Sequence, residues 1–132
     1  MSQENKSPTF LSSIPNAPKA IGPYSVATIH GSVVYCSGQI GLDPETGKIV
    51  SADFEDQARQ VLKNISAVLA DLKIGTSDII KATVFMTDLS NFPKFNEIYS
   101  EWLNGAKPAR STIGVAALPA GAVVEVEIIA SV

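Results

Sequence analysis

The chain has 132 residues, the length of one domain, and carries 10 lysines and arginines against 13 aspartates and glutamates. This small acidic excess, without a basic run, argues against a nucleic-acid-binding protein. A single cysteine, Cys36, excludes an intrachain disulfide, and a single histidine, His30, leaves too few ligands for a typical zinc site. We therefore expect no protein-built metal site.

The first twenty residues contain three prolines and scattered polar residues without apolar periodicity. This composition predicts a flexible N-terminal arm over residues 1–20 and a single folded domain over residues 21–132. The arm lacks both the apolar run of a secretion signal and the arginines of a mitochondrial presequence, so we expect a cytoplasmic protein. No segment reaches the ~18 apolar residues that a membrane-spanning helix needs.

Two short runs rich in β-branched residues predict strands at 25–29 and 33–37. The sequence His30-Gly31-Ser32 between them predicts a hairpin turn. Turn-forming residues over 43–47 come next, and Ile49 and Val50 predict one further short strand.

Two amphipathic helices follow, each with apolar residues at intervals of three and four. In the first, Asp53 is the expected N-cap and Gly75 the expected left-handed residue at the end. The second contains Pro93 in its first turn and ends at Asn104-Gly105. The expected buried stripes are Phe54, Ala58, Val61, Leu62, Ile65, Val68, Leu69 and Leu72, and then Phe92, Phe95, Ile98, Tyr99, Trp102 and Leu103. A strand predicted at 82–86 lies between the helices and can run parallel to an earlier strand.

Strands at 110–115 and 123–131 complete an expected mixed sheet with two helices packed on one face. In the last strand an apolar row, of Val124, Val126, Ile128 and Ala130, fits under the helices, so Glu125 and Glu127 face the other way. That second face is either exposed to water or an interface between subunits around a polar pocket. A content of 45% hydrophobic and 17% charged residues favours self-association. Whether Arg110, in the neighbouring strand, shares the face of Glu125 stays open.

Six segments in order along residues 20–130 resemble the RidA (YjgF) family of reactive-intermediate deaminases. They are Ile21-Gly22-Pro23-Tyr24, Ser37-Gly38-Gln39-Ile40, Ala58-Arg59-Gln60-Val61, Val84-Phe85-Met86-Thr87-Asp88-Leu89, Pro108-Ala109-Arg110-Ser111 and Val124-Glu125-Val126-Glu127. The resemblance implies a chorismate-mutase-like α+β fold, with residues 21–132 as the catalytic domain of a homotrimer whose sites lie between subunits. It also implies hydrolysis of 2-iminopropanoate and 2-iminobutanoate, with their enamine tautomers 2-aminoacrylate and 2-aminocrotonate, to 2-oxo acids and ammonia.

The same resemblance assigns roles to individual residues. Arg110 falls on the arginine that binds the substrate carboxylate, and Glu125 on the glutamate that activates water. The family's other pocket residues fall on Tyr24, Ser37, Gly38 and Asn96. Many members have a cysteine where this chain has Thr112, which leaves a backbone carbonyl to hold water but no thiol. Glu127 shares the face of Glu125 and is the alternative base, but it lies outside the matched position.

These residue types suit the reaction. A guanidinium holds a planar carboxylate with two parallel hydrogen bonds, and a placed carboxylate contributes about 10² to 10⁴-fold by moving protons. An imine carbon is already electrophilic, so no cofactor or metal is expected. The expected partners are small 2-imino and 2-oxo acids and other copies of the chain, with neither a membrane nor a nucleic acid. The alternatives are a regulatory protein that binds a 2-oxo acid without turnover, and a translation-inhibiting endoribonuclease as reported for some relatives.

Overall fold

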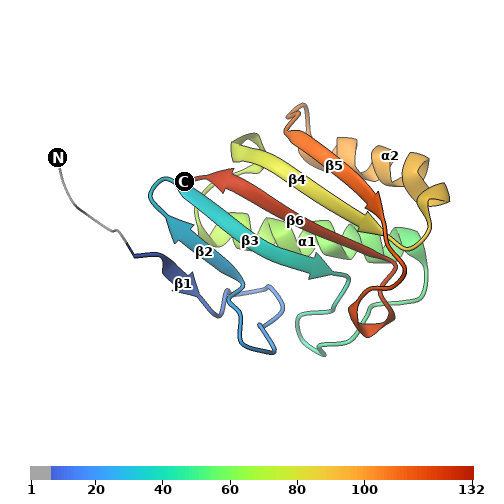
Figure 1. Ribbon diagram of the computed structural model, residues 1–132, viewed down its shortest axis with the longest axis horizontal. Helices are drawn as coiled ribbons and strands as arrows, with labels where there is room; N and C mark the ends of the chain where they lie inside the picture. Colours follow the sequence, from blue (N-terminus) through green and yellow to red (C-terminus); the bar gives the residue numbers. More distant parts are fainter. Residues whose placement is uncertain (1–6) are drawn as a thin grey trace.

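The computed structural model describes residues 7–132 and places six strands in one mixed sheet, in the spatial order β1-β2-β3-β6-β4-β5 (Figure 1). Both helices lie on one face of this sheet (Figure 1). The strands are β1 Thr9–Leu11, β2 Ala27–His30, β3 Val33–Ile40, β4 Ile79–Met86, β5 Ala109–Gly114 and β6 Val124–Ser131, and the helices are α1 Phe54–Asp71 and α2 Phe92–Leu103. The expected α+β domain with a mixed sheet and two helices is confirmed. None of the helices within residues 7–132 is long and apolar enough to cross a bilayer.

The N-terminal segment differs from the loose arm expected over residues 1–20. Residues 1–6 lie outside the described part of the chain, but Thr9–Leu11 forms β1 and pairs antiparallel with β2. Ile14 and Ala17 are buried in the core, at 3% and 6% exposure. The pairing with β2 and the burial of Ile14 are contacts distant in sequence, which local composition does not reveal.

The predicted hairpin forms, with Gly31 in the left-handed region at its turn. The second strand runs three residues beyond the predicted end, to Ile40, through a bulge between Cys36 and Gln39. The short strand expected at Ile49 and Val50 is wrong, because Ile49 makes only an isolated bridge to Leu42.

Helix α1 begins as predicted, with the Asp53 side chain accepting from the Asp56 N–H at 3.0 Å. Its end differs from the prediction, since Lys73, with φ of 60°, takes the left-handed conformation that was expected of Gly75. The Ile74 N–H then bonds to the Leu69 carbonyl, which is the arrangement of a Schellman cap two residues earlier than Gly75. Helix α2 ends at Asn104 and Gly105, both in the left-handed region, as predicted.

The order of the strands decides where the last two elements lie. β6 inserts between β3 and β4 and is antiparallel to both, so β4 runs parallel to β3 without pairing with it. β5 pairs parallel with β4 and forms the edge, so the expectation that it neighbours β6 is wrong. Pro108, which has no N–H to donate, precedes this edge strand, where a proline is tolerated.

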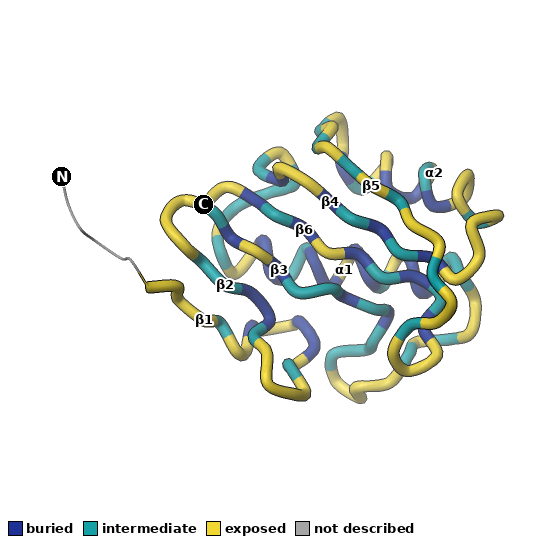
Figure 2. Tube along the Cα trace, in the orientation of Figure 1, coloured by how far each residue is buried: buried dark blue, intermediate teal, exposed yellow. Residues whose placement is uncertain are grey.

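Buried and more exposed residues alternate along the strands (Figure 2), because the two faces of the sheet have different environments. The face under the helices is the hydrophobic core, and the predicted apolar row of β6 is at most 1% exposed. We call the other side the open face. Register places Tyr35, Thr83, Phe85, Ser111, Ile113, Glu125, Glu127 and Ile129 on it. Ile113 is 44% exposed and Tyr35 is 50% exposed, so apolar side chains lie there beside two carboxylates.

Candidate active site

Arg110 lies near the start of β5, on the face that the helices cover. Its register partner on β4 is Ala82, which is buried in the core, so the Arg110 side chain points toward α2. The guanidinium carbon lies 5.1 Å from the centroid of the Tyr99 ring, 5.4 Å from that of Phe92 and 5.9 Å from that of Phe95. All three are within the range of a cation–π contact.

A cavity of about 460 Å³, the Arg110 cavity, opens beside this arginine. It is lined by Asn96, Tyr99, Ser100, Leu103, Gly105, Ala106, Lys107, Pro108 and Arg110. Asn96 Oδ1, the Tyr99 hydroxyl and Thr112 Oγ1 are buried without a hydrogen-bond partner in the described chain. Burial raises the pKa of Tyr99, and the charge of Arg110 opposes part of that rise. This end of the domain therefore has a cation and buried polar atoms that lack partners.

Glu125 lies at the start of β6, on the open face. Its register partners are Phe85 on β4 and Ile40 on β3. Burial raises the pKa of its carboxyl, and the nearby charge of Glu127 raises it further. A carboxyl with a raised pKa exchanges protons closer to neutral pH, as a general acid or base requires.

Gly38, in the bulge of β3, leaves the space that Glu125 occupies. A Cβ atom at position 38 would overlap with Glu125 Oε2 and would lie 2.8 Å from its Cδ. Any side chain at position 38 would therefore displace the carboxylate. The lack of a side chain at position 38 therefore leaves room for the carboxylate of Glu125 on the adjacent strand.

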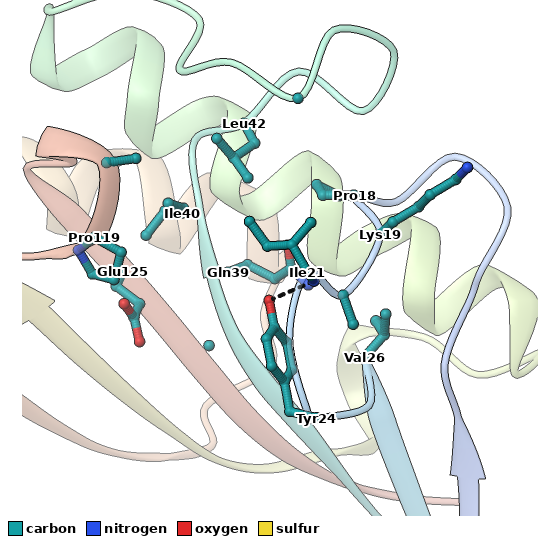
Figure 3. Close-up of a pocket in the computed structure, with 14 residues that line it drawn as sticks. Pro18, Lys19, Ile21, Tyr24, Val26, Gln39, Ile40, Leu42, Pro119 and Glu125 are labelled. Carbon is teal, nitrogen blue, oxygen red and sulfur yellow. Dashed lines mark hydrogen bonds between the residues drawn. The ribbon is translucent and has the colours of Figure 1, made fainter.

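A second cavity, the Glu125 cavity, has a volume of about 390 Å³ and is shown in Figure 3. Tyr24 lines it, and its hydroxyl accepts from the Ile21 N–H at 3.4 Å, drawn as the dashed line in Figure 3. The remaining wall is largely apolar. The lining residues are Pro18, Lys19, Ala20, Ile21, Tyr24, Val26, Gly38, Gln39, Ile40, Leu42, Gly47, Pro119, Ala120 and Glu125.

Ser37 does not line either cavity. Its hydroxyl donates to the Ser25 carbonyl at 2.6 Å, and its N–H donates to the Val26 carbonyl. Both bonds tie β3 to the segment that leads into β2. In this chain Ser37 therefore holds the backbone next to Gly38 and Tyr24 in place.

Two buried amides of α1 bond to the backbone just before β6, which carries Glu125, and around the end of the neighbouring strand β3. Gln57 Oε1 accepts from the Val123 N–H at 2.9 Å, and its Nε2 donates to the Ser51 carbonyl. Asn64 Nδ2 donates to the carbonyls of Ile40 and Leu42. Gln57 and Asn64 are 1% and 0% exposed. Sequence reasoning missed both, although their spacing of seven places two amides beside the apolar stripe of one helix.

Arg110 and Glu125 are not brought together within one chain. On β4, Arg110 pairs with Ala82 and Glu125 pairs with Phe85, so the two positions are three residues, or about 10 Å, apart along the strand direction. Across the sheet, β5 and β6 are separated by β4 and therefore lie about 10 Å apart. The sheet itself lies between the two side chains, because they point to opposite faces. The candidate residues thus lie in two separate cavities, with Asn96 beside Arg110 and with Tyr24 and Gly38 beside Glu125.

Neither metal nor thiol chemistry is indicated by the described side chains. Within residues 7–132, no three His, Cys, Asp or Glu side chains gather closely enough to hold a metal ion. Cys36 is buried in the core, and burial raises the pKa of its thiol to about 12, so the thiol stays protonated at neutral pH.

A model of the family described as Endoribonuclease L-PSP matches residues 14–132. The chain belongs to the RidA/YjgF/L-PSP family. The resemblance carried by the six segments is thereby confirmed. The match begins at Ile14, inside the stretch that the sequence pattern assigned to an arm.

Individual members of the RidA/YjgF/L-PSP family are similar over nearly the whole chain. A RutC family protein of Pyrococcus horikoshii is 47% identical over 115 residues, 87% of this chain and 91% of that protein. A protein of Dermatophagoides farinae named 2-iminobutanoate/2-iminopropanoate deaminase is 41% identical over 121 residues, 92% and 94% of the two chains. The crystal structure of E. coli TdcF with bound serine has a TM-score of 0.87 at 41% identity and covers 94% of this chain and 98% of that one.

Proposed function

We propose that this RidA/YjgF/L-PSP protein is a deaminase of reactive 2-imino acids. It hydrolyses 2-iminopropanoate and 2-iminobutanoate, with their enamine tautomers, to 2-oxo acids and ammonia. The active site is formed between the subunits of a homotrimer, with Arg110 from one chain and Glu125 from the next.

The observation that supports this most is the division of the candidate residues between two cavities. A substrate carboxylate needs the guanidinium in the Arg110 cavity, and an attacking water needs the carboxylate in the Glu125 cavity. Because these lie on opposite faces of one sheet, the complete site requires the Arg110 edge of one subunit to meet the open face of another. The exposed apolar side chains of the open face are suited to such a contact, since an exposed apolar surface marks an interface.

The reaction follows from the two groups. Arg110 binds the carboxylate with two N–H groups and orients the adjacent C=N carbon. Glu125 takes a proton from water as its oxygen bonds to that carbon, and the proton passes to the nitrogen. The new hydroxyl then gives its proton to Glu125 as the C=O bond forms, and the nitrogen takes up that proton as the C–N bond breaks, so that one imine and one water give one 2-oxo acid and one ammonia. In this proposal Asn96 and Tyr24, which line the two cavities, bind the substrate, and the backbone carbonyl of Thr112, which lines neither cavity, holds water.

Two relatives add support. The Dermatophagoides farinae protein is named for this activity, and the TdcF structure holds serine, whose α-carboxylate is the group that Arg110 would bind. The family model carries an endoribonuclease description, but the net charge of −3 gives no basic footprint for RNA.

The test is a coupled assay in which a pyridoxal-phosphate dehydratase generates 2-aminoacrylate and the release of ammonia is followed. The wild type should accelerate release, and Arg110→Ala should abolish the acceleration while keeping the wild-type oligomer. Arg59→Ala is the matched control, because Arg59 is the other arginine and pairs on the surface with Glu55 and Glu101. A wild type that adds nothing to the dehydratase overturns the proposal.

The wild type and Arg110→Ala also distinguish the deaminase from the regulatory and endoribonuclease alternatives. Tight binding of 2-oxobutanoate without any imine hydrolysis indicates a regulatory protein. RNA cleavage that persists in Arg110→Ala indicates another site or a contaminant.

A further inference from the structure

The two arginines of the chain are stabilised in different ways. Arg59 donates to Glu55 at 3.0 Å and to Glu101 at 3.3 Å. Within residues 7–132, no carboxylate lies within ion-pair distance of Arg110. Its neighbours are the rings of Phe92, Phe95 and Tyr99, with centroids 5.1 to 5.9 Å away.

The three rings come from one side of α2. Positions 92, 95 and 99 follow the spacing i, i+3, i+7, so their side chains lie above one another on the helix. Phe95 and Tyr99 stack at 5.3 Å and are buried, at 0% and 6% exposure. Phe92 is 38% exposed and forms the outer ring. The sequence pattern assigned all three only to the buried stripe.

We propose that the rings of Phe92, Phe95 and Tyr99 are positioning residues for Arg110, holding its guanidinium while its N–H groups stay free for the carboxylate of the substrate. This inference rests on the proposed function and names how its carboxylate site is built. We call the three residues the ring cradle.

The physical reason is the shape of a guanidinium. Its positive charge interacts with rings over its flat faces, whereas its five N–H donors all point outward in its plane. A carboxylate of the protein would occupy the same donors that the substrate needs, as Glu55 and Glu101 do at Arg59. Aromatic rings orient the cation without occupying its N–H donors.

Removing the outer ring should therefore weaken the binding of the carboxylate more than the chemical step. Phe92→Leu keeps an apolar side chain but loses the ring, and we expect KM to rise about three- to tenfold with kcat within about twofold. Phe92→Tyr restores a ring and should restore KM. Phe10→Leu, which removes an exposed ring on β1 far from Arg110, is the matched control and should leave KM unchanged.

A second readout does not depend on activity. Because the chain has only two arginines, its arginine side-chain NMR spectrum contains two Nε–H signals, and Arg59 serves as the internal reference. Phe92→Leu should move the Arg110 signal by removing a ring current and should leave the Arg59 signal in place. Phe92→Met takes its place if the leucine variant does not form the wild-type oligomer.

The outcomes are distinct. Three results would each overturn the proposed role of the ring cradle. They are an Arg110 signal that Phe92→Leu does not move, a KM that rises equally in Phe10→Leu, and a raised KM that Phe92→Tyr does not restore. A wild type without imine hydrolysis overturns the proposed function, while the NMR comparison still decides whether the rings hold Arg110.

Discussion

Arg110 and Glu125 lie on opposite faces of one sheet, three residue rows apart. Each lines its own cavity, and neither cavity contains both the Arg110 guanidinium and the Glu125 carboxylate. In the proposed trimer, the apolar side chains that lie next to two glutamates on the open face are covered by a neighbouring subunit. In the proposed mechanism, catalysis therefore requires assembly of the subunits.

The first prediction concerns that assembly. Ile113→Asp places a charge among the apolar side chains of the open face and should produce folded monomers without imine hydrolysis, because burying an unpaired carboxylate in an interface is costly. Sedimentation and the coupled assay measure the two effects. Val50→Asp, in an exposed loop position, should retain both assembly and activity. A monomeric Ile113→Asp protein with wild-type activity would contradict the intersubunit site.

The second prediction concerns pH. Glu125 acts as a base only when ionised, and a raised pKa moves the acid limb of kcat/KM to higher pH. The charge of Glu127 is the smaller cause of the rise, after burial, so Glu127→Gln should lower the pKa of Glu125 and move the acid limb to lower pH. A pH profile checks this. If the acid limb of kcat/KM stays in place or moves to higher pH in Glu127→Gln, then this limb does not reflect the ionisation of Glu125.

The third prediction concerns Gly38. Gly38→Ala should displace the flexible Glu125 side chain without disturbing the fold, so we expect a fall in kcat of about 10² or more with an unchanged melting temperature. Gly75→Ala is the matched control, since a Cβ atom at position 75 would have no neighbour within 4 Å and the φ of Gly75 is ordinary. Full activity in Gly38→Ala would mean that the position of the carboxylate is not decisive.

The fourth prediction concerns the buried amides. Gln57→Met leaves the Val123 N–H and the Ser51 carbonyl without their partners and should lower the free energy of unfolding by about 1–3 kcal/mol. Denaturant unfolding at a fixed protein concentration measures this. Lys63→Met, at an exposed position of the same helix, should have little effect. An equal loss in both variants would argue against a specific role for Gln57.

The sequence predicted the elements whose signals are local. The Asp53 cap, the two helical stripes and the alternation of β6 each depend on neighbouring residues, and the structure confirms them except at Phe92, which was expected to be buried but is 38% exposed. β1 was not predictable, because three residues carry little periodicity and Thr9–Leu11 is held by pairing with β2. The side of the sheet on which Arg110 lies was also not predictable, because it depends on β4 lying between β5 and β6.

The candidate site was predictable as a set of residue types but not as an arrangement. The local motifs identified Tyr24, Gly38, Asn96, Arg110 and Glu125 as candidate site residues. Each of the five lines one or the other of the two cavities. Their division between the two cavities follows from strand order. The ring cradle was hidden because aromatic residues at helical spacing are also what a buried stripe requires, and the amides of α1 because their partners are backbone groups distant in sequence.

The most direct test of the central claim is complementation between two inactive variants. Arg110→Ala keeps Glu125, and Glu125→Gln keeps Arg110, so each trimer alone has no complete site. When the two chains are unfolded together and refolded in equal amounts, random assembly should rebuild about one quarter of the sites, and with them about one quarter of the wild-type imine hydrolysis. Trimers that mix, as followed by mass, but recover no activity would contradict a site shared between subunits.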